Sequence, residues 1–419
     1  MNTFIALRCT VLFAVALASA GTAVAQEREC KRALLEALGW RFVATSDRRL
    51  RVEPGTPCER ASLIEAQAMG DMQVFVPGSA GREVMAALHQ ELLEHSATTC
   101  AYAFKLGDAT RRAVDRLAAN PGYRFSSLQT GWIGFGVGGA ARDGWRQIAP
   151  FGRGYIPRAG NWRAIEGFYH GEVRAECGVG RQVAQFAALA ELFGPRGFDA
   201  AFKADEIAIG TWHLLNRSGG ILQGEAAGRM THDGLARGAS QLGRQAFAGV
   251  PGYIEHVYGR ETLDDINNQA ENFVVYAVGA KAAAGLRAHG GLAHYNRMAE
   301  ALWRLSGTLP RQGGRYFERL LVEREAPLQA QLDATQRATL AQMDALLADP
   351  FFSEFRIYVH RHGVTPVSYH LVRLLDRNPR TPFRIALALH NVHTTLMQRW
   401  IEFQLDHCAA GDALPASQR

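Results

Sequence analysis

The sequence lacks the features that mark several large classes of protein. It has no internal repeat and no low-complexity segment, and its basic residues, 46 Lys and Arg against 40 Asp and Glu, are scattered rather than clustered. A chain without a Lys/Arg run offers no continuous positive track to a phosphate backbone, so nucleic-acid binding is not expected. The net charge of +6 implies only a mild attraction to anionic cell surfaces or acidic proteins.

Long apolar runs are also scarce. Thr10–Ala20 (TVLFAVALASA) is almost wholly apolar, but about 11 residues are too few for a membrane-spanning helix, which needs roughly 20. Arg8 lies in the short polar head before this run, and Ala23–Ala25 (AVA) after it forms an A-x-A cleavage site. We therefore predict that residues 1–25 are a secretory signal peptide. The mature protein would be periplasmic or secreted and would keep no integral membrane segment.

Cysteine is rare, and its count in the mature chain is odd. Removal of Cys9 with the signal peptide leaves five of the six cysteines. In the oxidising compartment expected for an exported protein, four can pair and one is left over. Cys177 lies alone in the middle of the chain, so it is the candidate free thiol. The sequence leaves open how the remaining four form disulfides: Cys30, Cys58, Cys100 and Cys408.

Hydrophobic patterns divide the mature chain into three regions. Residues 26–120 carry apolar residues at helical spacing, and this predicts a mainly helical N-terminal region with breaks at Gly107 and at residues 120–122. Residues 121–296 predict a mixed α+β core that includes a buried strand, Glu271–Gly279 (ENFVVYAVG).

Residues 297–408 again predict helices. Asp333 and Gln336 resemble a capping box at the start of a helix that stops before Pro350. Residues 381–408 are expected to form one long final helix. Residues 409–419 are expected to be a disordered tail.

Cys177 lies in the first turn of a predicted amphipathic helix that stops at Gly194 and Pro195. The helix dipole and the unpaired N–H groups of a first turn favour a thiolate and can stabilise an oxyanion on a substrate carbonyl. The alternative is a structural cysteine at a crowded helix end. The helix is predicted from apolar residues that share one face: Val179, Val183, Phe186, Ala187, Ala190 and Phe193.

Two segments resemble the active-site segments of the bacterial spore-coat protein-glutamine gamma-glutamyltransferases, the small bacillus-type transglutaminases. The first is residues 175–202 (AECGVGRQVAQFAALAELFGPRGFDAAF), and the second is residues 270–279 (AENFVVYAVG). That family has a Glu-Cys pair before an apolar helix and a Gly-Glu-Asn triplet that opens a strand. Here Glu176-Cys177 and Glu271-Asn272 match these motifs. The similarity covers about residues 150–296, and Ala270 stands where the family has glycine.

The resemblance implies a papain-like α+β core in which the cysteine helix packs on a small antiparallel sheet, with extensive helical additions at both ends. It implies a cofactor-independent acyltransferase, with no metal, that crosslinks exposed glutamine and lysine side chains of proteins through a cysteine thioester. Cys177 would be the nucleophile, Glu271 the base or orienter, and Glu176 an assisting carboxylate. An equally weighted role for Glu176 is compensation of the helix dipole.

Two other functions stay open. His289, downstream of Cys177, could be the base of a papain-like cysteine hydrolase that acts on peptide or cell-wall amide bonds. Alternatively, the chain is a secreted interaction module without activity. The G-x-G-x-x-G match at residues 134–139 lacks a convincing strand before it, and His360, His362, His390 and His393 lack further ligands, so neither a dinucleotide nor a metal site is expected.

Overall fold

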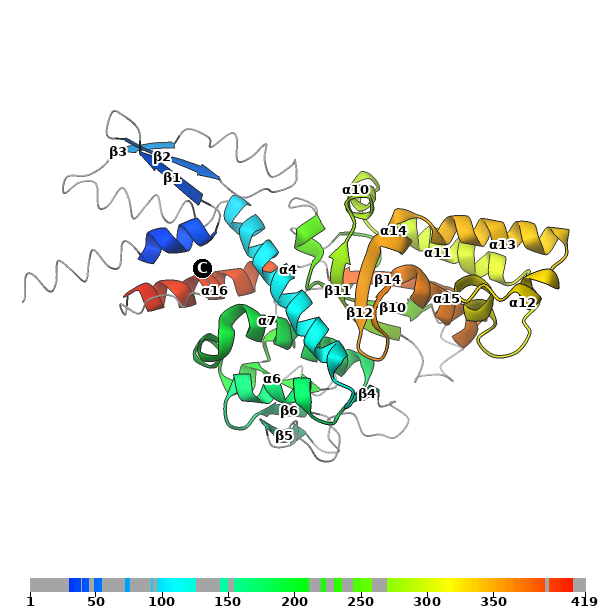
Figure 1. Cartoon of the computed structure of the whole chain (residues 1–419), viewed down its shortest axis with the longest axis horizontal. Coiled ribbons are helices and arrows are strands. Elements are labelled where there is room, and N and C mark those ends of the chain that lie inside the picture. The colour runs from blue at the N-terminus through cyan, green and yellow to red at the C-terminus, as the bar shows by residue number, and fades with distance from the viewer. Residues whose placement is uncertain are drawn as a thin grey trace, which may run out of the picture. The chain divides into compact units, whose positions relative to one another are not determined.

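The computed structural model describes most of the chain after residue 29, and its residues form two compact units (Figure 1): residues 1–102 with 397–419, and residues 103–396. The predicted signal peptide, Cys58, the glycine-rich segment at 134–139 and the tail after residue 409 lie outside the described residues. None of the helices within the described ranges is long and apolar enough to cross a membrane. The described ranges are 30–38, 40–44, 49–54, 72–75, 92, 96–125, 144–149, 154–210, 220–223, 230–235, 244–257, 270–388 and 392–409.

The first unit contains a three-stranded antiparallel sheet, so the prediction of a mainly helical region is wrong for this stretch. Its strands are β1 (Trp40–Ala44), β2 (Arg49–Pro54) and β3 (Met72–Phe75), paired in that order. Aromatic and β-branched residues such as those of β1 (WRFVA) fit a pleated surface better than a helix. These strands lie between two segments that do carry helical spacing.

Helix α4 (Ser96–Ala119) runs without interruption through Gly107, where a break was expected. The glycine serves close packing, because a Cβ added there would lie 3.2 Å from the Cβ of Ala248. The predicted break after Ala119 is confirmed. There the side chain of Asn120 accepts a hydrogen bond from Gly122 N and donates to the carbonyls of Phe168 and Gly171.

The second unit is built around a six-stranded antiparallel sheet in the order β13-β12-β11-β10-β14-β9. The predicted strand is confirmed as β11, and it pairs with β10 and β12. The six strands are β9 (Met230–Thr231), β10 (Pro251–His256), β11 (Ala270–Val278), β12 (Phe355–Val359), β13 (Gly363–Pro366) and β14 (Phe383–Ala388).

Half of this sheet comes from the region that the sequence predicts to be helical, so the core is not confined to residues 121–296. Strand β14 occupies the start of the predicted final helix, and helix α16 (Val392–Ala409) follows it. The error has a physical cause. β14 (FRIALA) is buried along nearly its whole length, and a continuous apolar run has no period that separates a strand from a helix.

Helix α7 (Cys177–Ala201) begins at the candidate nucleophile and packs on β11 and β12 of this sheet. All six residues of its predicted apolar face are fully buried. The predicted stop is confirmed as a kink: Gly194 has φ 71° and ψ 172°, and Pro195 starts the second segment. An antiparallel sheet under a helix that begins at a cysteine makes this an α+β protein, while the relationship to papain stays a prediction.

Shorter elements complete the second unit. β4 (Tyr123–Phe125) pairs in parallel with β7 (Val173–Ala175), which leads directly into α7, and α6 (Asn161–His170) packs against α7. A small sheet contains β5 (Trp145–Ala149), β6 (Gly154–Pro157) and β8 (Ile209–Gly210). The remaining α-helices are α10 (Ala280–Ala288), α11 (Ala293–Ser306), α12 (Ala326–Ala330), α13 (Ala334–Leu347), α14 (Pro350–Glu354) and α15 (Val367–Arg377).

The predicted capping box is confirmed at the start of α13. Asp333 accepts a hydrogen bond from Gln336 N at 2.8 Å, and Gln336 accepts one from Asp333 N at 3.0 Å.

The kink of α7 provides a test of the fold. We expect Gly194→Ala to lower the free energy of unfolding by about 1–3 kcal/mol, because its dihedral angles belong to a region that only glycine adopts readily. Chemical denaturation followed by circular dichroism measures this change. Gly314→Ala is the control, since its φ is not positive and a Cβ there meets nothing within 4 Å. Equal stability of the two variants would contradict the assignment of strain to Gly194.

Candidate active site

Three of the residues that carry the resemblance meet at the start of α7. Cys177 is half-buried, and among the described cysteines it is the free thiol. Its Sγ accepts a hydrogen bond from Asn272 Nδ2 at 3.3 Å and donates one to Glu176 Oε2 at 3.5 Å. Packing of α7 on β11 therefore brings together two motifs that lie 95 residues apart in the chain.

Glu176 both caps the helix and contacts the thiol. Its position therefore fits both predicted roles, compensation of the helix dipole and assistance to the nucleophile. Its Oε2 accepts from Gly178 N at 2.7 Å, and its Oε1 accepts from Val179 N at 2.6 Å. These are first-turn N–H groups that were expected to stabilise a substrate oxyanion, and the cap occupies them. At the sulfur itself, both the side-chain amide and the backbone N–H of Asn272 donate hydrogen bonds.

The glycines after Cys177 make room for protein groups rather than for a substrate chain. A Cβ at Gly178 would lie 2.6 Å from Glu176 Oε1, and a Cβ at Gly180 would lie 2.6 Å from His360 Nδ1. Both glycines therefore let neighbouring side chains approach the helix backbone.

The thiol is protonated at neutral pH, contrary to the expectation from the helix dipole. Burial raises the pKa of Cys177 to about 11, and the negative charge of Glu176 adds to this effect. The hydrogen bond from Asn272 lowers the pKa but does not compensate, and the charge of Glu271 raises it further. A nucleophilic attack by Cys177 would therefore require removal of this proton as the attack takes place.

Glu271 lies next to Asn272 on β11 and is 2% exposed. Its Oε1 accepts from Arg373 Nη1 at 2.9 Å and Arg361 Nη2 at 3.0 Å, and lies 3.2 Å from Arg377 Nη2. Its Oε2 pairs with His370 Nδ1. These contacts with three arginines and His370 engage both oxygens of Glu271.

Burial alone would raise the pKa of Glu271. The hydrogen bond and charge of His370, with the charges of Arg377 and Arg373, outweigh burial and hold this pKa well below its usual range. A carboxylate that binds protons so weakly is a poor base. The contacts favour the second of its two predicted roles, that of an orienter.

The rival base, His289, caps the end of α10 and packs among aromatic rings. Its ring stacks on His294 with centroids 3.8 Å apart and lies edge-on to Tyr295, and both of these neighbours are on α11. Another downstream histidine, His256, is buried beside Thr381 O and Phe383. His289 is exposed at the surface, whereas the surroundings of His256 are typical of a buried structural histidine.

Sequence reasoning missed two residues beside the first turn of α7. His360 is buried against Gly180, and burial lowers its pKa to about 4, so its ring is neutral. Arg181 follows Cys177 by four residues, a spacing that could have identified it. In the part of the chain that the structure describes, no group of three or more His, Cys, Asp or Glu side chains could hold a metal ion.

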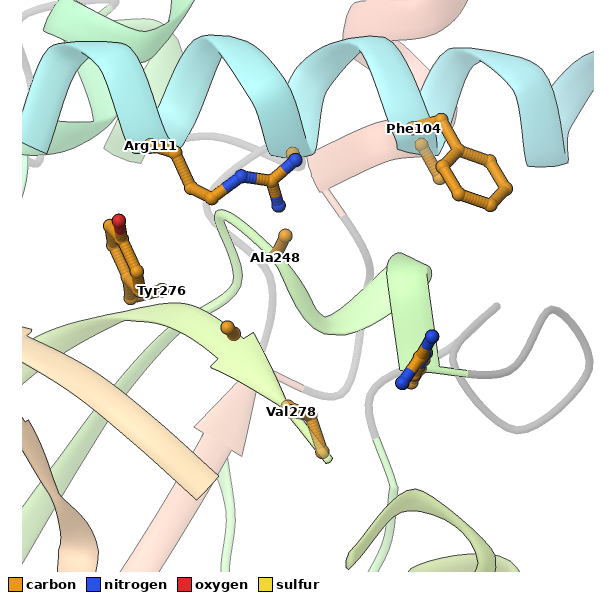
Figure 2. Close-up of a pocket in the computed structure, with 9 residues that line it drawn as sticks. Phe104, Arg111, Ala248, Tyr276 and Val278 are labelled. Carbon is orange, nitrogen blue, oxygen red and sulfur yellow. The ribbon is translucent and has the colours of Figure 1, made fainter. Parts of the chain in front are cut away.

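A cavity of about 280 Å³ lies elsewhere in the second unit (Figure 2). Phe104 and Arg111 on α4 face Ala248, Tyr276 and Val278 across it, the last two on β11. Its lining includes none of the predicted site residues, and the hydrogen bonds around Cys177 do not involve it.

No protein-family model, curated protein or solved structure matches this chain.

The Glu271 cluster predicts a pH-dependent stability. The pKa of Glu271 in the folded state is below its value of about 4.3 in an unfolded chain. Its stabilisation is therefore complete above about pH 4.3 and is lost as the pH falls through the folded-state pKa. We expect Glu271→Gln to lower the free energy of unfolding by about 3–5 kcal/mol at pH 7, because it leaves buried cations unpaired.

Urea unfolding of both proteins from pH 7 to pH 3 measures this difference, which should shrink as the pH falls. Glu172→Gln, at an exposed position, should change stability by at most about 0.5 kcal/mol at any pH. A loss for Glu271→Gln that stays constant down to pH 3 would contradict an ionised Glu271.

The thiol pKa can be tested by alkylation with iodoacetamide, quantified by mass spectrometry of the peptide that contains Cys177. We expect the rate to rise about tenfold per pH unit up to pH 9.5, because the thiolate reacts and an ordinary cysteine would level off above about pH 8.5. Glu176→Gln should level off at lower pH, since it removes a negative charge beside the sulfur. Glu172→Gln again serves as the control, and a plateau near pH 8.5 in the unmodified protein would refute the raised pKa.

Proposed function

We propose that the protein is an exported cysteine acyltransferase, a protein-glutamine gamma-glutamyltransferase that joins glutamine and lysine side chains. One observation carries this proposal. The Cys177 thiol lies between a carboxylate that accepts its proton, Glu176, and an amide that donates a hydrogen bond to it, Asn272. An uncharged carboxamide substrate needs both a proton acceptor for the thiol and a donor for the developing oxyanion.

In the acylation step, Sγ attacks the carboxamide carbon of a glutamine while its proton passes to Glu176 Oε2. A sulfur–carbon bond forms, and the negative charge moves onto the carboxamide oxygen. Collapse of this intermediate breaks the carbon–nitrogen bond, and the proton held by Glu176 leaves with ammonia. A thioester on Cys177 remains.

Asn272 is the residue that we assign to the oxyanion. Its side-chain amide carries two N–H groups and donates a hydrogen bond to Sγ in the free protein. It therefore lies next to the position that the attacked carbon must take. A donor held on the protein before the reaction stabilises the oxyanion without reorganisation. Glu271 acts indirectly, because its contacts with three arginines and His370 hold β11, and with it the adjoining Asn272, in place.

The acceptor step reverses this sequence with a lysine amine. The amine attacks the thioester carbon, a carbon–nitrogen bond forms and the sulfur–carbon bond breaks. Glu176 takes the proton that the amine loses and returns it to Sγ, which restores the neutral thiol. The product is an isopeptide bond, and the balance requires no cofactor.

The test is incorporation of a fluorescent primary amine into a glutamine-rich protein by the mature enzyme. We expect Cys177→Ala to abolish labelling and Asn272→Ala to lower kcat about 10²–10³-fold, as for loss of one oxyanion donor. His289→Ala is the matched control and should label at the rate of the unmodified enzyme, because its ring packs against α11.

Other results would point to the other functions. Ammonia release without amine uptake would identify a hydrolase, and loss of labelling in His289→Ala would return the base role to that histidine. If the protein releases no ammonia and labels nothing while Cys177 can still be alkylated, the interaction module would be the favoured function.

A further inference from the structure

Arg181 shares the nucleophile's face of α7. It follows Cys177 by four residues, and side chains at this spacing lie one above the other on a helix. Helical side chains also lean toward the N-terminus, so the guanidinium of Arg181 extends over the first turn, where Cys177 lies. The side chain is half-buried, and its Nε is fully buried.

The electrostatic neighbours of Arg181 place its charge in the candidate site. Burial lowers the pKa of Arg181, and the charge of Glu176 raises it; Cys177 and Tyr253 lie close enough to act on the guanidinium when they are ionised. Tyr253 lies on β10 directly opposite Asn272 in the strand register. Arg181 thus belongs to the same group of residues as the nucleophile and the assigned oxyanion donor.

The hydrogen bonding of Arg181 is incomplete. Its buried Nε has no hydrogen-bond partner. A donor buried without an acceptor, particularly one on a charged group, costs free energy that a bound acceptor would recover. A guanidinium offers parallel N–H groups in a planar fork, and this geometry matches the two oxygens of a carboxylate.

The wider charge balance also favours an anion. Arg361, Arg373 and Arg377 surround the single carboxylate of Glu271, and the side chains of these arginines are 16–21% exposed. Arg377 also lies close enough to Cys177 to interact with its thiolate, so the positive charge of these arginines extends toward the nucleophile. Such a field attracts a negatively charged substrate segment.

We propose that Arg181 is a specificity residue that binds a carboxylate beside the reacting carbon, so that the preferred substrate is an acidic segment of protein. The choice of substrate rests on the proposed acyl transfer. Recognition of a carboxylate next to Sγ does not depend on acyl transfer, and it can be measured without any turnover.

Alkylation of Cys177 provides that measurement. Iodoacetate and iodoacetamide both form a sulfur–carbon bond and release iodide, with the thiol proton lost to solvent, but only iodoacetate carries a carboxylate. The ratio of their rates cancels any change in the thiol pKa. We expect Arg181→Gln to lower the iodoacetate-to-iodoacetamide ratio at Cys177 about tenfold, as for loss of a charged hydrogen bond. Arg181→Lys should give an intermediate ratio, because it keeps the charge and loses the fork.

Arg174→Gln is the matched control, since Arg174 is exposed on β7 three residues before Cys177, and it should leave the ratio unchanged. The unmodified protein gives a second test that needs no variant: the ratio at Cys177 should be higher in the native protein than in urea. An unchanged ratio in Arg181→Gln, or equal ratios in native and urea-unfolded protein, would overturn the assignment.

Substrate preference is tested separately with glutamine peptides that differ only in flanking Asp or Ala. The Asp peptide should label with a kcat/KM about tenfold higher, and Arg181→Gln should remove this preference. If alkylation shows carboxylate recognition while no peptide is labelled, the proposed acyl transfer fails and the anion site stands. Equal labelling of both peptides would instead overturn the acidic-substrate assignment alone.

Discussion

The buried carboxylate of Glu271 is the interaction on which the site depends. Its partners come from the turn after β12 and from α15, so one charge ties β11 to two segments from the last quarter of the chain. Neighbouring residues on a strand point to opposite faces. Holding Glu271 against α15 on one face therefore fixes Asn272 on the other, where α7 presents Cys177. Burial of a carboxylate is unfavourable unless it is paired, and three arginines with His370 pair with this one. The sheet and the site thus share one anchor, although Glu271 itself need not exchange a proton.

Glu176 imposes the second constraint, because one carboxylate performs two tasks. As the cap, it accepts hydrogen bonds from two N–H groups of α7, which are then not available to bind an oxyanion. Burial is the main cause of the raised pKa of the sulfur, and the charge of Glu176 next to the thiol adds to it, so the helix dipole does not produce a thiolate. A cysteine in this setting stays protonated until a substrate arrives. The proposed chemistry then couples proton loss to attack, which makes an acceptor 3.5 Å from Sγ more useful than a preformed thiolate.

The parts of the structure that the sequence predicted well are those set by local patterns. The apolar face of α7, its kink at Gly194, the strand β11 and the capping box of α13 each depend on residues within one element. Strands β12 and β14 were missed because burial along most of their length erased their alternation, β13 because it has only four residues, and β1 to β3 because they lie between helical segments. The partners of Glu271 lie 90 or more residues away, so no local pattern connects them to it. The sequence therefore selected residues that the fold brings together, but only the long-range pairing separated an anchoring carboxylate from one that contacts the thiol.

The charges around Cys177 also distinguish the two ways in which a substrate can enter. With its carboxylate on Arg181, an acidic segment can place a neutral carboxamide at the sulfur between Glu176 and Asn272. The reverse orientation would bring that carboxylate against Glu176, and like charges at close range are strongly disfavoured. Attraction at one end and repulsion at the other select an orientation more sharply than either alone. The same layout disfavours attack on a carboxylate, since the carbon that reaches the sulfur must belong to an uncharged group. Arg181 and Glu176, five residues apart, would in this way determine both what binds and which of its carbonyl groups reacts.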